Sequence, residues 1–177
     1  TCRQLTNMVI PEGITELGKT LFANCPVLTS VVLPNTLQLV GRESFYNCPS
    51  IESIVLPASL KTIGSGAFYD CTKLMSVYSQ ATTPATIEGY PNSYYSYEKD
   101  AFNTVKTKAT LFVPETAVDA YKNKQFWQDF GDRIVGSNQI PCQQPTYELA
   151  DFKLTIQSLT DGASIYYTND GSNPDAN

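Results

Sequence analysis

Histidine is missing from this chain of 177 residues, and charged residues make up only 16% of it. The absence of histidine removes the commonest general base, the Ser-His-Asp and Cys-His catalytic arrangements, and most zinc sites. The sequence also contains no glycine-rich phosphate loop and no Cys-x-x-Cys pair, so we expect neither a cofactor nor a metal. Together these absences indicate that the chain is not an enzyme.

Positive charge is also scarce. Twelve Lys and Arg residues stand against 17 Asp and Glu residues, which gives a net charge of −5. The net field therefore repels phosphate backbones, and nucleic acid is not expected as a partner. A membrane-spanning helix needs a run of about 18 apolar residues, and no such run occurs. The first residues do not have the form of a signal peptide, so we expect any export signal to lie outside this stretch of sequence.

Four cysteines recur at one constant interval, at Cys2, Cys25, Cys48 and Cys71. Other residue types keep the same step: Pro11, Pro34 and Pro57; Gly18, Gly41 and Gly64; Phe22, Phe45 and Phe68; Leu5, Leu28, Ile51 and Leu74. Chance does not hold so many columns in register, so the chain contains an internal repeat. A unit of this length cannot bury its apolar face alone, which predicts that the units stack into a solenoid.

Each unit is predicted to open with a short β-strand. In one unit Leu28, Val31 and Leu33 are apolar, and the last two alternate with the strand period of two. Pro34 lacks an amide donor and ends the strand, while the glycine column permits backbone conformations that a β-carbon penalises. We expect the rest of the unit to form a turn or a single helical turn that packs its Phe inward. Neighbouring strands then pair into a parallel ladder along a curved solenoid.

The cysteine column has two interpretations. Because the cysteines lie one above another, we favour small buried hydrophobic side chains that line the stack. Strand neighbours are about 4.8 Å apart, which is within reach of disulfide geometry, so disulfide pairing stays open. Cys142 lies outside the column.

The best-formed repeat unit reads Ile-Val-Leu-Pro at 54–57, Leu-Lys-Thr-Ile-Gly at 60–64 and Ala-Phe-Tyr-Asp-Cys at 67–71. With this pattern the repeat resembles the BspA-like class of leucine-rich repeats. The resemblance covers residues 1–136 and implies an extracellular or cell-surface protein of a bacterium, because members are typically exported. It also implies an adhesin that binds host proteins. A repeat fold by itself does not specify a ligand.

An insertion at 88–100 interrupts the repeat, and Ala101-Phe102 then restores it. The insertion is rich in tyrosine: Tyr90, Tyr94, Tyr95 and Tyr97. Tyrosine gives a large contact area at low entropic cost, so the insertion is a candidate recognition surface. Equally, its rings would serve as a lid on the end of the hydrophobic stack.

A cap is predicted at 114–136, after a last ladder strand at 110–114. Residues 115–122 are predicted to form a helix with Thr116 as its N-cap. The Val-Pro start of this segment and the Trp-x-x-Phe pattern of Trp127 and Phe130 resemble the closing segment of the same family. Since a solenoid needs a cover on its last open face, Trp127 is interpreted as structural.

Beyond the solenoid, a polar linker with two prolines is predicted at 137–145. Residues 146–177 contain two strand-like stretches, at 154–156 and 163–168, and resemble part of an immunoglobulin-like module similar to the C-terminal domain of chitobiase. We expect this to be about half of such a β-sandwich, because the chain starts within a repeat and stops within the module. The missing strands leave an unpaired edge of the β-sheet. We expect this edge to be disordered, to pair with another copy of the chain, or to be covered in some other way.

The candidate binding surface is the concave side of the ladder. The side chains that alternate with the buried columns are expected to lie there: Asn7, Val9, Ser30, Val32, Ser53, Val55, Ser76, Tyr78 and Phe112. This uncharged, slightly apolar stripe suits a polypeptide or glycan better than an ionic ligand. Ser and Val are also ordinary residues on a sheet surface, so a purely structural interpretation stays open.

Three functions are compatible with the sequence. The first, implied by the resemblance, is a non-catalytic adhesion protein that recognises a host protein or glycan through the concave face and the tyrosine-rich insertion. The second is an accessory module of a larger carbohydrate-active enzyme, suggested by the chitobiase-like segment. The third is a structural stalk or spacer.

Overall fold

A computed structural model describes residues 2–89, 100–139, 146–150 and 153–157 of the chain. The chain divides into two compact units, Thr1–Pro141 and Cys142–Asn177. In the second unit, β11 (Thr146–Ala150) and β12 (Lys153–Gln157) pair antiparallel. The predicted strand at 163–168 and the four tyrosines of the insertion lie outside the described residues, so the immunoglobulin-like module stays a prediction.

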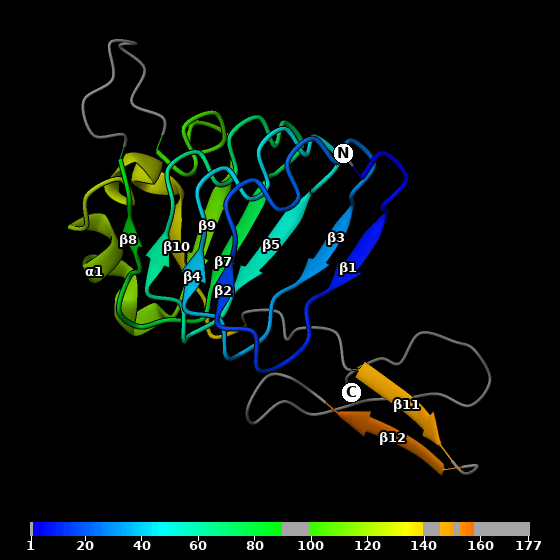
Figure 1. Ribbon diagram of the computed structural model, residues 1–177. Helices are drawn as coiled ribbons and strands as arrows, with labels where there is room; N and C mark the ends of the chain where they lie inside the picture. Colours follow the sequence, from blue (N-terminus) through cyan, green and yellow to red (C-terminus); the bar gives the residue numbers. More distant parts are fainter. Residues whose placement is uncertain (1, 90–99, 140–145, 151–152, 158–177) are drawn as a thin grey trace. The chain divides into compact units, whose positions relative to one another are not determined.

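The first unit is built on a ladder of short parallel strands, one from each repeat (Figure 1). They are β1 (Asn7–Val9), β3 (Ser30–Val32), β5 (Ser53–Leu56), β7 (Ser76–Ser79), β9 (Thr110–Val113) and β10 (Ile134–Gly136). The register keeps the step of the sequence repeat, since Asn7 pairs with Ser30 and Ser53 pairs with Ser76. This parallel stack confirms the predicted solenoid of repeats.

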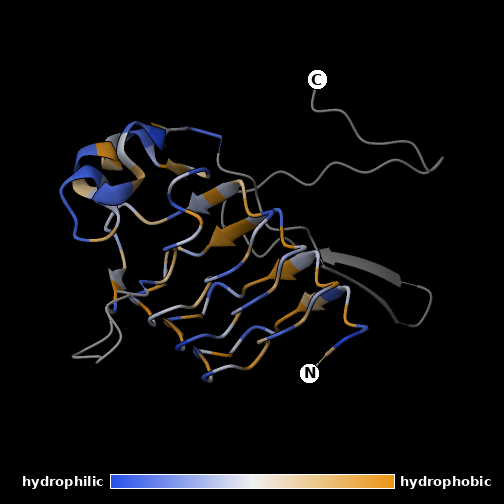
Figure 2. Cartoon of the chain, turned by 90° about the horizontal axis from the view of Figure 1, so that it is seen from above, coloured by the Kyte–Doolittle hydropathy of each residue, from blue (hydrophilic) through white to orange (hydrophobic). Residues whose placement is uncertain are grey.

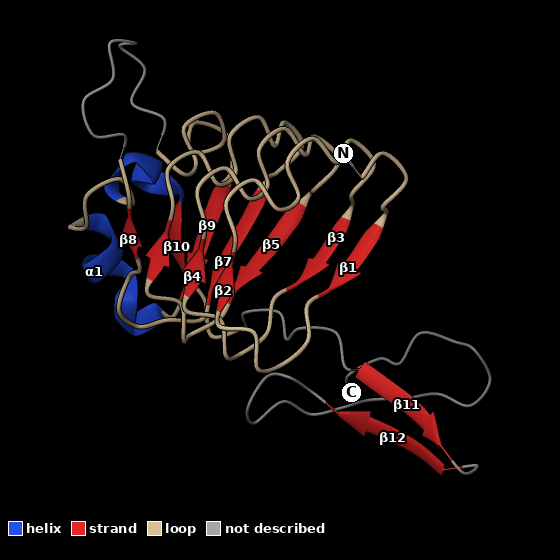
Figure 3. Ribbon diagram, in the orientation of Figure 1, coloured by secondary structure: helices blue, strands red, loops and turns tan. Residues whose placement is uncertain are grey.

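A second ladder, which the sequence pattern did not predict, runs along the same stack (Figure 3). It consists of the two-residue strands β2 (Glu16–Leu17), β4 (Leu39–Val40), β6 (Thr62–Ile63) and β8 (Thr86–Ile87), which are also parallel. The expectation of one strand followed only by a turn or helical turn was therefore wrong. The second residue of each of these strands is buried. Leu17, Val40 and Ile63 belong to one repeat column, and the backbone is extended where this column enters the core.

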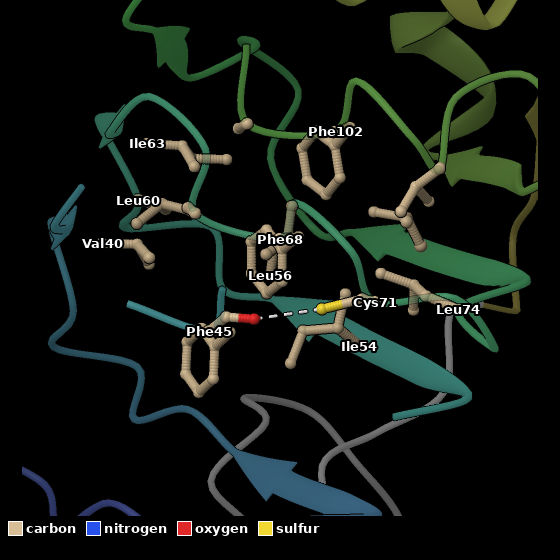
Figure 4. Packing of buried hydrophobic residues seen from close by; sticks show 14 of the residues in the cluster. Val40, Phe45, Ile54, Leu56, Leu60, Ile63, Phe68, Cys71, Leu74 and Phe102 are labelled. Atoms are coloured by element: carbon tan, nitrogen blue, oxygen red, sulfur yellow. Dashed lines mark hydrogen bonds between the residues drawn. The ribbon is translucent and has the colours of Figure 1, made fainter. Parts of the chain in front are cut away.

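The core of the solenoid is a column of phenylalanine rings. Phe22, Phe45, Phe68 and Phe102 stack face to face, with ring centroids 5.3, 5.3 and 5.0 Å apart and interplanar angles of 14° or less. Figure 4 shows Phe45, Phe68 and Phe102 inside the stack, with Ile54, Leu56 and Ile63 around them. In Figure 2 the ladder strands carry much of the hydrophobic colour. The stack confirms that the constant interval places like side chains above one another.

Close packing of successive coils, rather than an unusual dihedral angle, requires glycine at Gly41 and Gly64. A β-carbon at Gly41 would lie 2.9 Å from the carbonyl carbon of Gly18, and one at Gly64 would lie 2.8 Å from the Cα of Arg42. Neither glycine has a positive φ, so the reason expected from the sequence was wrong at these positions. Left-handed backbone occurs elsewhere in each turn, at Asn24, Asn47 and Asp70, where Asn and Asp tolerate it best.

The cysteine column consists of free thiols. Cys25, Cys48 and Cys71 are buried, whereas Cys2 is exposed, which corrects the expectation that the whole column lies inside. The Cys48 thiol donates to the carbonyl of Phe22 (3.0 Å), and the Cys71 thiol donates to that of Phe45 (3.2 Å; Figure 4). Burial is the main cause that raises the pKa of Cys48 to about 11 and that of Cys71 to about 12. These buried residues act as small core side chains, as predicted.

This difference in exposure predicts selective labelling of the thiols. At pH 8 a maleimide reagent is expected to modify Cys2 at least a hundredfold faster than Cys48 or Cys71, since the thiolate is the reactive form and both buried thiols stay protonated. Peptide mass spectrometry of a labelling time course measures this, with the chain in 6 M guanidinium as the control in which the rates converge. Equal rates in the native chain would contradict the buried column.

The cap differs from its predicted form in two ways. The predicted helix is divided into a 3₁₀ turn η1 (Glu115–Ala117) and α1 (Val118–Lys122), followed by η2 (Gln128–Arg133). No side chain caps η1 or α1, so the N-cap role expected for Thr116 is wrong. The last ladder strand is β10 rather than β9, because Ile134 pairs with Leu111 at the same repeat step.

Large aromatic side chains attach the cap to the solenoid. Trp127 is fully buried beside Phe102 (centroids 5.5 Å apart), and its indole N–H donates to the carbonyl of Ala85 (2.7 Å). The hydroxyl of Tyr121 lies 2.6 Å from that of Ser79 and donates to the carbonyl of Ala81 (3.1 Å). Burial raises the pKa of Tyr121 to about 12. The structural role predicted for Trp127 is therefore confirmed.

Candidate binding surface

The solvent side of the first ladder presents two columns of side chains, which we call the ladder face. Adjacent strands bring corresponding residues into register, and alternate residues point to the same side. One column is polar: Asn7, Ser30, Ser53, Ser76 and Thr110. The other is apolar: Val9, Val32, Val55, Tyr78 and Phe112. The structure thus places the residues predicted for the concave face in two columns, which run over two hydrogen-bonded sheets, β1–β3 and β5–β7–β9–β10.

The two columns are exposed or half-buried, unlike the residues between them. Val9 is 51% exposed, whereas Ile54, Val77 and Leu111 on the strands of the same ladder are almost fully buried. The columns contain no charged side chain, and their hydroxyl and amide groups offer both donors and acceptors. A ligand for this surface would therefore meet a neutral strip that is polar along one line and apolar along the next.

Tyr78 and Phe112 form the most prominent feature of the apolar column. Their rings stack with centroids 4.8 Å apart and an interplanar angle of 14°, and both residues are half-buried. Because each ring covers a face of its neighbour, part of the aromatic surface is already used within the protein. The pair forms a rigid aromatic anchor, the kind of group that contributes most binding energy at interfaces.

The ladder face extends one strand further than the sequence predicted. Val135 pairs with Phe112 and is 40% exposed, so it continues the apolar column. The signal was available in the sequence, since 134–136 follow 111–113 by the same step that separates the cysteines of the column. It was missed because Gly136 replaces the apolar residue found at Val113, and because the helical segment before β10 obscures the repeat.

A buried ion pair holds the end of the insertion against the cap. Asp100 is 3% exposed at its side chain and accepts from the Nζ of Lys106 (2.5 Å), which also contacts Asp129 of η2 (2.6 Å). Burial acts to lower the pKa of Lys106, but the hydrogen bonds and charges of the two carboxylates outweigh it and raise the pKa. Arg133 donates to the carbonyl of Lys106 through Nε and Nη2. The residue that ends the insertion is therefore fixed to the solenoid.

Among residues 2–89, 100–139, 146–150 and 153–157, no group of three Cys, Asp or Glu side chains is arranged to hold a metal ion. No helix in the part of the chain that the structure describes has the length and apolar character to cross a bilayer. The ladder face is thus the candidate site on which both the sequence pattern and the geometry converge.

The stacked repeat units, with two ladders of paired parallel strands and an aromatic core, define a leucine-rich-repeat protein. The pattern of the BspA type leucine rich repeat region matches residues 1–128 in six copies. The chain belongs to this family. The match includes the segment around the insertion and reaches Trp127 in the cap.

No curated protein matches the chain. One similar solved structure is a leucine rich cell surface protein from Faecalibacterium prausnitzii A2-165, with 24% sequence identity and a TM-score of 0.47. The similarity covers 66% of this chain and 38% of that protein, so this chain spans well under half of that protein's length.

Proposed function

We propose that this chain is a non-catalytic binding protein, exported to the bacterial cell surface or secreted, that recognises a host protein or a glycan. Membership of the BspA-type family is consistent with a non-enzymatic binding or surface role. The observation that carries the proposal is the ladder face, on which two neutral columns run side by side and the apolar one contains the Tyr78–Phe112 stack. The tyrosine-rich insertion is proposed as a second part of the same recognition surface.

The chemistry of the ladder face favours a neutral polymer as ligand. Ser30, Ser53, Ser76 and Thr110 of the polar column each offer a hydroxyl group, and neighbouring strands are about 4.8 Å apart, so a ligand with its own repeating polar groups can form several similar hydrogen bonds. Beside these hydrogen bonds, the apolar column provides apolar contacts with the ligand that exclude water. The stacked rings of Tyr78 and Phe112 form the rigid centre of those contacts. The backbone of an extended polypeptide or the hydroxyl groups of a glycan meet these requirements.

The direct test measures binding to immobilised host matrix proteins and to a glycan array. We expect Phe112→Thr to weaken binding about thirtyfold, which is the effect of losing an anchor residue at an interface. Threonine suits a strand, so the ladder should be retained, and circular dichroism checks that it is. Thr86→Ala, at an exposed position of the second ladder, is the matched control and should bind like the unmodified chain.

The insertion is tested separately with Tyr94→Ala and Tyr95→Ala. Weaker binding by these variants would support the insertion as part of the recognition surface. Unchanged binding by both would remove the insertion from the proposal and leave the ladder face. Absence of any ligand in these screens, with the unmodified chain folded, would contradict the proposed binding function and favour a spacer.

A further inference from the structure

The first ladder is interrupted between β3 and β5. Its strands form two separate hydrogen-bonded sheets, β1–β3 and β5–β7–β9–β10. One unit before the interruption the Thr29 N–H donates to the carbonyl of Thr6 (2.8 Å), and one unit after it the Met75 N–H donates to that of Glu52 (3.0 Å). Within the described residues, the equivalent bond from the Glu52 N–H to the carbonyl of Thr29 is not formed. We call this interruption the ladder break.

The two units that meet at the ladder break remain joined elsewhere around the coil. In the second ladder β4 pairs with β6, and the Gly64 N–H donates to the carbonyl of Val40 (2.7 Å). In the turns that follow, the Phe45 N–H donates to the carbonyl of Ala67 (2.8 Å). The rings of Phe45 and Phe68 stack in the core between them. The units are therefore bonded at two sides and in the core, and parted only at the first ladder.

The close contact at the glycines gives these two coils the form of a wedge. A β-carbon at Gly64 would lie 2.8 Å from the Cα of Arg42, so the coils already touch where the second ladder ends. They part at the first ladder, where β3 and β5 do not pair. The open edge of the wedge therefore lies on the ladder face.

Unused backbone groups of both strands face the ladder break. Alternate residues of a strand direct their N–H and C=O groups to opposite neighbours. The Ile10 N–H donates to the carbonyl of Val32 (3.0 Å), so Val32 faces β1 and Val31 faces β5. By the same rule Ser53 and Val55 of β5 face β3. These donors and acceptors would pair if the two strands came to the ladder spacing of about 4.8 Å.

We propose that the ladder break is a hinge, at which β1 and β3 move as one body against the sheet β5–β7–β9–β10. The second ladder and the phenylalanine column form the axis of this movement. In the closed state the facing backbone groups pair with each other, and in the open state they bind water. Because the ladder face crosses the break, the hinge changes the curvature of that surface. The hinge does not depend on which ligand the ladder face binds.

The two states of the hinge differ little in free energy. A backbone hydrogen bond formed on closure replaces bonds to water, so its net contribution to stability is small. The core contacts between the two units are the same in both states, since the stack of Phe45 on Phe68 lies on the axis. Hinge movements of packed units take place in microseconds to milliseconds, a range that nuclear magnetic resonance measures.

Amide hydrogen exchange, measured residue by residue, tests whether the ladder is open at the break. We expect the amides of Ser53 and Val55 to exchange about tenfold faster than those of Ser76 and Tyr78, which occupy the same positions one unit later and face β5. Val55 and Tyr78 are both half-buried, so they form a matched pair. Equal protection of the two sets would mean that β3 and β5 are paired, and would overturn the proposal.

Relaxation dispersion distinguishes a hinge from a fixed opening. We expect millisecond exchange at the amides of Val31, Ser53 and Val55, and flat profiles at Ser76 and Tyr78. Fast hydrogen exchange with flat profiles at the break would mean that the opening is static, which contradicts a hinge. Dispersion spread evenly over the whole solenoid would contradict a movement located at the break.

A disulfide across the break tests closure directly. Ser30→Cys with Ser53→Cys places two thiols one repeat step apart, in a chain that also carries Cys2→Ser and Cys142→Ser to prevent other pairings. The bond requires Cα atoms about 4.4–6.8 Å apart, which the strands reach at ladder spacing. With oxidised glutathione we expect the bond to form and the dispersion at the break to disappear.

The matched control is Ser53→Cys with Ser76→Cys in the same background, because β5 and β7 are already paired. This bond should form and leave the dispersion at the break unchanged. If only the control bond formed, β3 and β5 would not approach each other and the hinge would be wrong. Dispersion that persisted with the Ser30–Ser53 link in place would also overturn the proposal, because the movement would then lie elsewhere.

Discussion

Replacing Trp127 with alanine is expected to lower the free energy of unfolding of the solenoid by about 4 kcal/mol, which is typical of a fully buried tryptophan. The indole contacts three aromatic rings, those of Phe102, Tyr121 and Phe130. Its loss would open a cavity at the end of the phenylalanine column. It would also leave the carbonyl of Ala85 without its N–H donor.

Chemical denaturation followed by far-ultraviolet circular dichroism measures this loss. Trp127→Phe is the matched variant, because it keeps an aromatic ring in the site while removing the hydrogen bond to Ala85. We expect it to cost less than half as much as Trp127→Ala. Since the chain has one tryptophan, fluorescence of the unmodified chain reports the cap directly. Equal stability of Trp127→Ala and the unmodified chain would contradict the role of the cap as a cover for the core.

The features that could be predicted from the sequence are those that repeat. The columns of Phe22, Phe45 and Phe68 identified the core, because identical side chains at a constant interval must occupy equivalent places in a stack. The alternation in 53–56 and 76–79 correctly assigned which residues face outward. Register and burial therefore followed from the period alone, without knowledge of any single contact.

The features that were missed depend on contacts between units. The second ladder consists of strands of two residues, too short to show an alternation in one copy. The requirement for glycine at Gly64 is explained by its short distance to the backbone of Arg42 in the neighbouring coil. The pattern within one repeat unit does not reveal this distance. The helical segments of the cap form without the N-cap expected at Thr116, because the packing of Tyr121 and Trp127 contributes more than a hydrogen bond at the helix end.

The candidate binding surface also has features that the repeat predicted and features that it did not. The polar and apolar columns of the ladder face were predicted from alternation, and Val135 was missed because β10 follows a segment without the repeat pattern. The stack of Tyr78 on Phe112 joins residues on either side of the insertion, so their contact depends on where the ladder resumes. The role of Tyr90, Tyr94, Tyr95 and Tyr97 stays a prediction.

Gly64→Ala is expected to have the second large effect, a loss of about 3 kcal/mol in the free energy of unfolding, near the upper end of what overpacking a core costs. The added methyl carbon would lie 2.8 Å from the Cα of Arg42 and 2.8 Å from the carbonyl carbon of Gly41. Both are backbone atoms of the neighbouring coil, so no change of side-chain rotamer relieves the contact. The coils must separate, which would weaken the hydrogen bond from the Gly64 N–H to the carbonyl of Val40 (2.7 Å).

Gly18 provides the matched control, because it occupies the same column and a β-carbon there would meet nothing within 4 Å. Gly18→Ala should leave the stability unchanged or raise it slightly, since alanine reduces the conformational freedom of the unfolded chain. Thermal and urea unfolding of the two variants measure the difference. If both substitutions had the same effect, the column would be explained by intrinsic backbone preference. A loss confined to Gly64→Ala, by contrast, follows from the close approach of successive coils, on which the stacking of the phenylalanine column also depends.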